Sequence, residues 1–208
     1  MPENAPEHEY DRKGPITMTT TTTPRSALDA ERADLLAELA VARSALTRTT
    51  HGLSDEQVGE HPTVSALCLG GLIKHVASAE EGWMRFAVDG PSALRFDLPD
   101  GVTWDGIMAG TARELPQWIT DRQNEFRMQP GETLAGVVSR YEEVAARSEE
   151  IIASLDLSAT HPLPAAPWHE LGAVRTVRWV LLHIIAETAQ HAGHADILRE
   201  TLDGQTAT

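Results

Sequence analysis

The sequence predicts an all-α fold, a four-helix bundle whose helices are joined partly by long crossover connections. Of the residues, 41% are apolar but only 5% are aromatic, and alanine and leucine dominate, a composition that favours helices over sheets. Four segments repeat apolar residues every three to four positions, as amphipathic helices do. The 208 residues fall within the usual size of one domain. We therefore expect the four helices to share one core.

The first part of the chain, residues 1–24, is predicted to be a disordered extension. It is rich in Pro, Glu, Asp and Thr, includes a threonine run at 19–23, and contains too little apolar surface to offset the entropy of ordering it. The bundle is expected over residues 25–204, followed by a short tail at 205–208.

The four helices are expected at residues 26–49, 64–88, 133–155 and 176–199. The second ends at a helix-stopping run that begins with Asp89 and Gly90. Thr176 is the expected N-cap of the fourth helix, and Gly204 follows its end.

Two long connections separate these helices. Residues 91–131 mix Gly, Pro and isolated aromatic residues, and their weak periodicity predicts only a short helix at about 102–122. Residues 156–174 hold three prolines and are expected to be irregular.

The formal net charge of -14, from 31 acidic and 17 basic residues, argues against nucleic acid or an anionic membrane surface as a partner. A small or neutral partner is expected instead. Cys68 is the only cysteine, so an intrachain disulfide and a cysteine-rich zinc site are excluded. With no base adjacent in sequence, we expect Cys68 to be a small buried apolar residue rather than a nucleophile. No apolar run is long enough to span a membrane and no signal sequence is recognisable, so we expect a cytoplasmic protein.

The fourth predicted helix carries a stripe of polar residues on the side that faces the core. His183, Glu187, His191 and His194 follow each other at spacings of four, four and three, which places them within an arc of about 80° on one helix face. A carboxylate and imidazoles that are partly buried need partners, because desolvating a charge without compensation costs several kcal/mol. A metal ion would supply that compensation.

Glu187 and His191 have the i, i+4 spacing that lets two side chains of one helix bind one ion, and imidazole with carboxylate suits zinc, nickel or iron(II). The best third ligand is His75, on the second predicted helix. Two alternatives remain open at this point: His75 as a hydrogen-bonded residue at the edge of the core, and the stripe as a polar face held by local pairs. For His183 and His194, three roles remain open: partners of the ligands, a fourth ligand, or groups that transfer protons.

The segment LLHIIAETAQHAGHADILRETLDG, residues 181–204, resembles the DinB superfamily of metal-binding four-helix proteins, especially an actinobacterial branch of unknown function. The resemblance extends over most of the chain from about residue 26 and implies a bundle of DinB type. It implies a metal held by His75, Glu187 and His191. Glu187 at the middle position is similar to the mycothiol-dependent maleylpyruvate isomerases, whereas His194 stands where many relatives have glutamine.

The resemblance also implies an activity. The expected protein is a divalent-metal-dependent S-transferase or isomerase that uses mycothiol or a similar low-molecular-weight thiol, with zinc or nickel as the metal and a small electrophile as substrate. On this hypothesis His183 or His194 relays a proton, and the two long connections shape the pocket. The alternative hypothesis is a non-catalytic, stress-associated metal-binding bundle, with a homodimer as its expected assembly. Nucleic acid is disfavoured as a partner by the acidic charge.

Overall fold

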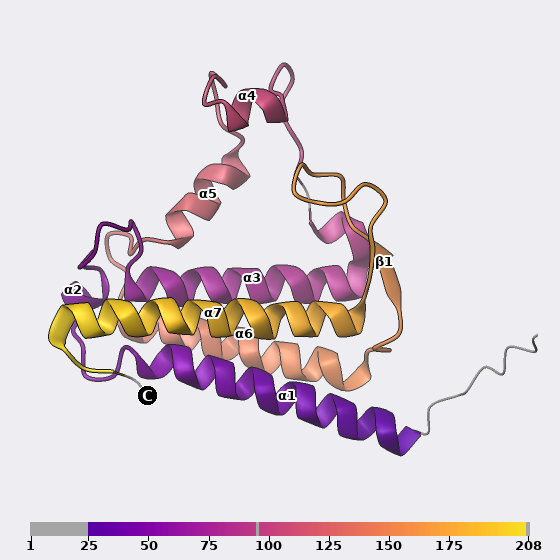
Figure 1. The fold of residues 1–208 in the computed structure, drawn as a ribbon, viewed down its shortest axis with the longest axis horizontal. Coiled ribbons are helices and arrows are strands. Elements are labelled where there is room, and N and C mark those ends of the chain that lie inside the picture. The colour runs from indigo at the N-terminus through magenta and orange to yellow at the C-terminus, as the bar shows by residue number, and fades with distance from the viewer. Residues whose placement is uncertain (1–24, 95, 207–208) are drawn as a thin grey trace, which may run out of the picture.

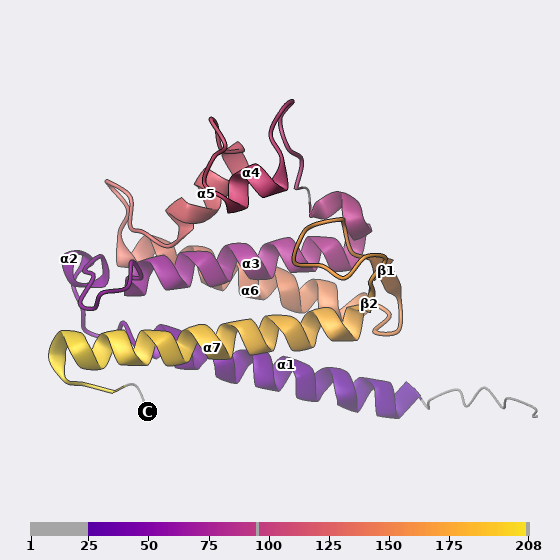
Figure 2. The same cartoon turned by 45° about the horizontal axis from the view of Figure 1, so that its top comes forward.

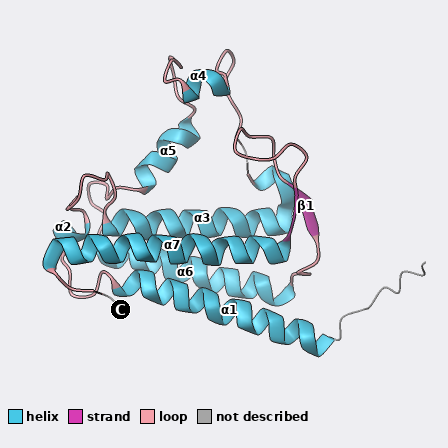
Figure 3. Cartoon of the chain, viewed as in Figure 1, coloured by secondary structure: helices cyan, strands magenta, loops and turns pink. Residues whose placement is uncertain are grey.

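Four long helices form the bundle in the computed structural model, which describes residues 25–94 and 96–206 (Figure 1). They are α1 Arg25–Arg48, α3 Leu69–Asp89, α6 Leu134–Ser154 and α7 Val177–Asp203. Helix is the dominant structure of the described chain (Figure 3). The predicted all-α bundle is therefore confirmed. The predicted disordered extension at 1–24 lies outside the described residues, as do the last two residues of the predicted tail.

The helices pack unevenly around the bundle. The main packing partner of α1 is α7, and α3 packs against both α6 and α7, whereas α1 and α6 meet at few points. Two views of the ribbon show α1 and α7 side by side along most of their length (Figures 1 and 2). Among the described residues, no helix is both long and apolar enough to span a bilayer.

The core consists of two apolar clusters, one toward each end of the bundle. The first includes Leu72, Tyr141 and Leu198, and the second includes Phe86 and Ile152. Between them lie buried polar side chains, one from each long helix, which we call the polar layer. Its members are Arg43, Glu80, Ser148 and Thr188.

An ion pair between Arg43 and Glu80 dominates the polar layer. The guanidinium of Arg43, on α1, donates to both carboxylate oxygens of Glu80, on α3, and Nε–Oε2 is 3.1 Å. Its Nη1 also donates to Glu149 of α6 at 3.0 Å. The side chain of Glu80 is fully buried, and a buried charge is tolerated only when it is paired and hydrogen-bonded. The pair therefore fixes the register of α1, α3 and α6.

The second long helix begins later than the sequence predicts. It starts at Leu69, five residues beyond the expected position, because Val64 is fully exposed and Cys68 is still extended at the helix N-cap. Residues 64–68 form bends and irregular backbone rather than helix. A short helix, α2 Asp55–Val58, lies before them, and a capping box between Ser54 and Gln57 closes its N-terminus.

The prediction of a single short helix at about 102–122 is wrong. The connection forms a 3-10 turn, η1 Gly90–Ala93, and two helices, α4 Trp104–Met108 and α5 Gln117–Glu125. The break follows from Gly110, whose φ of 67° ends α4 in a conformation that favours glycine. In Figure 1, α4 and α5 form an arm that rises from the bundle on the side of α3.

The connection expected to be irregular at 156–174 contains a small antiparallel hairpin. Its strands are β1 Thr160–Pro162 and β2 Val174–Thr176, with His161 opposite Arg175. β2 leads directly into α7, where the hydroxyl of Thr176 accepts a hydrogen bond from the backbone N–H of Trp179. Gly204 ends α7 in the left-handed conformation, with φ 77°. The predicted N-cap and stop of this helix are confirmed.

A pair of glycines at the start of α3 lets the end of the α4–α5 arm pack directly on that helix. A Cβ atom at Gly71 would overlap the carbonyl oxygen of Phe126, and one at Gly70 would overlap the side chain of Met128. The sulfhydryl of Cys68 donates to the same Phe126 carbonyl, with an S–O distance of 3.5 Å. The backbone of residues 126–128 therefore lies against α3 because two side chains are missing there.

We expect Gly71→Ala to destabilise the fold by about 1–3 kcal/mol, because its methyl group must push the backbone at Phe126 away. Gly193→Ala is the matched control, since a Cβ there meets nothing within 4 Å on α7, and alanine should stabilise that helix by about 0.5–1 kcal/mol. Urea unfolding of both variants measures the difference. Equal effects at the two sites would contradict the close packing at Gly71.

Glu80→Gln should cost about 3 kcal/mol or more in the free energy of unfolding, because it leaves the buried Arg43 guanidinium without its anion. Glu81→Gln, one position along the same helix, removes a partly exposed pair with Arg140 and should cost less than about 1 kcal/mol. Chemical denaturation again provides the measurement. A small effect at Glu80 would mean that the ion pair does not hold the helices in register.

Candidate metal centre and adjoining cavity

Three side chains from α3 and α7 converge beside the polar layer: His75, Glu187 and His191. One potential ligand atom from each lies within 4.8 Å of the others. The Oε1 atom of Glu187 is 3.4 Å from Nε2 of His75 and 3.4 Å from Nε2 of His191. The fold thus brings together the three residues that the sequence singled out as one ligand set.

The two 3.4 Å contacts are long hydrogen bonds, since a good N–H···O bond spans about 2.7–3.2 Å. They match the spacing of two ligands on one ion: metal–ligand bonds of about 2.1 Å in tetrahedral geometry place neighbouring donor atoms about 3.4 Å apart. The donor set of two imidazoles and one carboxylate therefore fits a divalent ion in chemistry, and the two separations from Glu187 fit it in spacing.

Both histidines of this group, His75 and His191, also have a partner at Nδ1, the ring nitrogen that points away from Glu187. Nδ1 of His75 lies 3.1 Å from Oε2 of Glu125, at the end of α5. Nδ1 of His191 lies 3.4 Å from Nδ1 of His194. With an ion bound, the proton of His75 would lie on Nδ1 and be donated to Glu125, and the Nε2 lone pair would face the ion, the arrangement in which a second carboxylate orients a metal-binding imidazole.

The protonation of the group follows from these contacts. Burial lowers the pKa of His75, but hydrogen bonds to Glu125 and Glu187 outweigh it, so this pKa is raised above its usual value. Hydrogen bonds from His191 and His75 hold the pKa of Glu187 far below its usual range. Glu187 is therefore a carboxylate at neutral pH, the form that binds cations. An entering ion would compete with protons for His75.

Phe126 covers one side of the group. Its ring stacks on His75 with centroids 4.0 Å apart and planes at 25°, and only 1% of the His75 side chain is exposed. Cys68 is fully buried and holds the Phe126 backbone. This placement agrees with the expected packing role of Cys68 rather than with a nucleophile.

A cavity of about 740 Å³ opens on the other side, with Glu125 and Glu187 in its wall. Aromatic side chains from α3, the α4–α5 arm, the hairpin and α7 make up much of the rest of its lining. They are Trp83, Phe96, Trp118, Trp168, His169, Trp179 and His183. A volume of several hundred Å³ with a few polar groups suits a small molecule.

The two histidines expected to handle protons lie in different places. His183 lines the cavity, stacked on Trp179 with centroids 4.9 Å apart and in edge contact with Trp83 at 4.7 Å. Burial lowers its pKa, so the ring is neutral near pH 7 and can accept a proton. His194 instead contacts His191 behind the group.

The sequence did not reveal Glu125 or Phe126 as parts of this site. Both lie in the long connection, where apolar periodicity is weak, and both reach His75 only through the close packing at Gly71. A carboxylate or a phenylalanine in an irregular segment gives no signal of its own, because its partner is 50 residues away in the chain.

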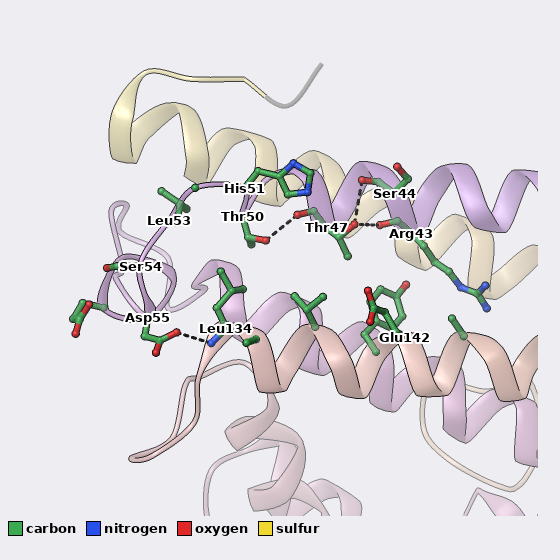
Figure 4. Close-up of a pocket in the computed structure, with 16 residues that line it drawn as sticks. Arg43, Ser44, Thr47, Thr50, His51, Leu53, Ser54, Asp55, Leu134 and Glu142 are labelled. Atoms are coloured by element: carbon green, nitrogen blue, oxygen red, sulfur yellow. Dashed lines mark hydrogen bonds between the residues drawn. The ribbon is translucent and has the colours of Figure 1, made fainter.

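A larger cavity, of about 850 Å³, lies along the open seam between α1 and α6. Figure 4 shows Arg43 and Thr47 on the α1 side and Leu134 and Glu142 on the α6 side. Its lining contains none of the three residues of the candidate metal group. Volume alone therefore does not mark the functional site, and we place the chemistry at the smaller cavity.

Comparison with known proteins gives one result that bears on this site. A family model described as Mycothiol-S-transferase matches residues 34–204, which includes all of the candidate ligands and the whole of the cavity. The match agrees with the resemblance to the DinB superfamily. No curated protein sequence matches the chain.

If the group binds metal, the protein without an affinity tag should hold about one zinc or nickel ion per chain after incubation with the metal, as measured by elemental mass spectrometry. His75→Ala and His191→Ala should each lose it, because two ligands hold an ion far less firmly than three. His194→Ala should weaken binding about 10–100-fold through the loss of its contact with His191.

His51→Ala is the control, since this exposed histidine lies in the turn after α1, away from the group. The variants must remain helical by circular dichroism. Unchanged metal content in both ligand variants would show that the three side chains form only a hydrogen-bonded polar cluster.

Proposed function

The chain belongs to the mycothiol-S-transferase family, and from this premise we propose that it is a divalent-metal-dependent S-transferase. It would join a low-molecular-weight thiol, mycothiol or a close analogue, to a small electrophile. The observation that carries the proposal is the position of the ligand group: Glu187 belongs both to the three-residue group and to the wall of the aromatic cavity. The proposed metal site therefore lies beside the cavity that would hold the substrates.

We assign His75, Glu187 and His191 as the metal ligands. Three protein ligands leave at least one coordination position free, as in catalytic sites, and this donor set suits zinc or nickel. An ion held there would act as a Lewis acid that lowers the pKa of a thiol and favours the thiolate near neutral pH.

His183 is the proposed acceptor of the thiol proton. Its ring is neutral because burial lowers its pKa, and it lies in the cavity one helical turn before Glu187. Trp179 and Trp83 hold the ring in place from two sides. With the proton on the imidazole, the sulfur forms a bond to the electrophilic carbon and the leaving group departs with the electron pair of its own bond.

His194 is proposed to act through His191 rather than on substrate. As acceptor of the Nδ1 proton of His191, it would fix the tautomer in which Nε2 of His191 can bind the ion. Glu125 does the same for His75. This division of roles explains why the two surplus histidines of α7 stand on opposite sides of the ligand group.

We expect His191→Ala to abolish thiol-dependent turnover, measured as thiol consumed with 1-chloro-2,4-dinitrobenzene as electrophile. His183→Gln should lower kcat about 10²–10⁴-fold, the usual contribution of a general base, while metal content stays unchanged. His51→Ala serves again as control. Wild-type turnover in a folded His191→Ala protein would rule the proposal out.

The non-catalytic alternative predicts a different outcome on metal removal. A structural ion would contribute to folding, so its removal by a chelator should lower the Tm strongly. Our proposal expects a change of only a few degrees, because the polar layer and the two apolar clusters hold the bundle without the ion. A large fall in Tm together with no turnover would favour the structural role.

A further inference from the structure

All five tryptophans of the chain gather at the cavity beside the ligand group. Trp83, Trp118, Trp168 and Trp179 line it. The fifth, Trp104, packs against two of these, with ring centroids 5.9 Å from Trp118 and 5.1 Å from Trp168. Only 5% of the residues are aromatic, yet all of the tryptophans lie at this one cavity.

These rings form two walls. On the α3–α7 side, Trp83 contacts Trp179 edge to face, with centroids 5.6 Å apart. On the arm side, Phe96 contacts Trp118 and Trp168 in the same manner, at 5.5 and 5.2 Å. Flat apolar rings bind best between such walls, because aromatic pairs add a preference for stacked or edge-on geometry to the burial of area.

Three arginines also line the cavity: Arg85, Arg122 and Arg175. Within the described part of the chain, no carboxylate forms an ion pair with any of them. The carboxylates of the same lining are Glu125 and Glu187, which are engaged with His75, and the exposed Glu170. Arg85 and Arg122 are exposed, whereas Arg175 is half-buried.

Arg175 is arranged to receive a planar anion. Its guanidinium lies over the ring of Trp179, 5.1 Å from the centroid, and its Nη1 donates to the carbonyl of Val174 at 3.1 Å. On the opposite edge, made of Nε and Nη2, Nε is buried without a hydrogen-bond partner among the described residues. Such an edge matches a carboxylate with two parallel hydrogen bonds.

Arg122 supplies positive charge closer to the ligand group. It lies on α5, three residues before Glu125, and its charge is among those that act on His75. It has no ion-pair partner in the described chain, so its guanidinium is free to meet an anion in the cavity. The cavity lining therefore carries an unpaired arginine from α5 and another from β2.

We propose that this cavity selects aromatic electrophiles that carry a carboxylate, with the ring between the tryptophans, the carboxylate on the free edge of Arg175, and Arg122 adding positive charge to the same lining. The proposal rests on the transferase function proposed above and names its substrate class. With a chloroarene, the thiol sulfur bonds to the ring carbon, chloride leaves with the electron pair of the C–Cl bond, and the thiol proton passes to a ring nitrogen of His183 and then to solvent. No oxidant or reductant is needed.

The first measurement is binding, which does not depend on turnover. Isothermal titration calorimetry on the metal-loaded protein would compare 4-chloro-3-nitrobenzoate with 4-chloro-3-nitrobenzamide, a neutral compound of the same shape. We expect the benzoate to bind at least about tenfold more tightly, the effect of one good charge-assisted pair. The aliphatic 2-chloropropanoate should bind at least about tenfold more weakly than the benzoate, because it lacks the ring.

The variants then assign the preference to the arginines. In Arg122→Gln, Arg175→Gln double-substituted protein, the affinity for the benzoate should fall to that for the amide, while amide binding and metal content stay unchanged. Arg113→Gln, an exposed position outside the cavity lining, should retain the full preference. If the double variant does not fold, the two single variants should each reduce the preference.

The outcomes separate this proposal from the proposed function. Equal binding of benzoate and amide by the wild type, or a preference that survives in the double variant, overturns the substrate class even if thiol-dependent turnover is normal. A preference that disappears in the variants supports the binding proposal even if 1-chloro-2,4-dinitrobenzene is not turned over, in which case the transferase function fails alone.

Discussion

The fold depends on how a helical bundle accommodates buried charge across its middle. Each long helix contributes a polar side chain between the two apolar clusters, and the Arg43–Glu80 pair compensates the largest of the desolvation costs. Apolar burial is non-directional, so it specifies the register of the helices less sharply than a buried ion pair does. A buried guanidinium that must meet a carboxylate on α3 and another on α6 allows one register only.

The candidate centre follows from that fixed register. His75 lies on the same helix as Glu80, and Glu187 precedes Thr188 of the polar layer by one residue, so the placement of α3 against α7 sets the distance between the imidazole and the carboxylate. The long helices therefore provide the ligands, and the arm provides Glu125, which orients one of them, and Phe126, which covers it. Rigid elements hold the proposed reactive atoms, and connections shape the space around them.

What the sequence could predict follows the same division. The stripe on α7 and its match with His75 were visible because helical periodicity turns spacing into direction. The contact between the end of the arm and α3 could not be predicted, because the approach of Phe126 depends on the absence of side chains at Gly70 and Gly71. The hairpin before α7 was hidden for a similar reason. Its strands have three residues each and include a proline, so they are defined by their pairing rather than by composition.

The gathering of every tryptophan at one cavity has a spectroscopic consequence. Nearly all of the intrinsic fluorescence of the protein must arise from indoles around this space, while the apolar cluster near α2 contains no tryptophan. Emission would thus follow the state of the arm and the hairpin more closely than that of the whole bundle. An unfolding curve recorded by fluorescence and one recorded by circular dichroism would separate if the arm opens before the helices melt, and the gap between them would measure the local stability of the arm.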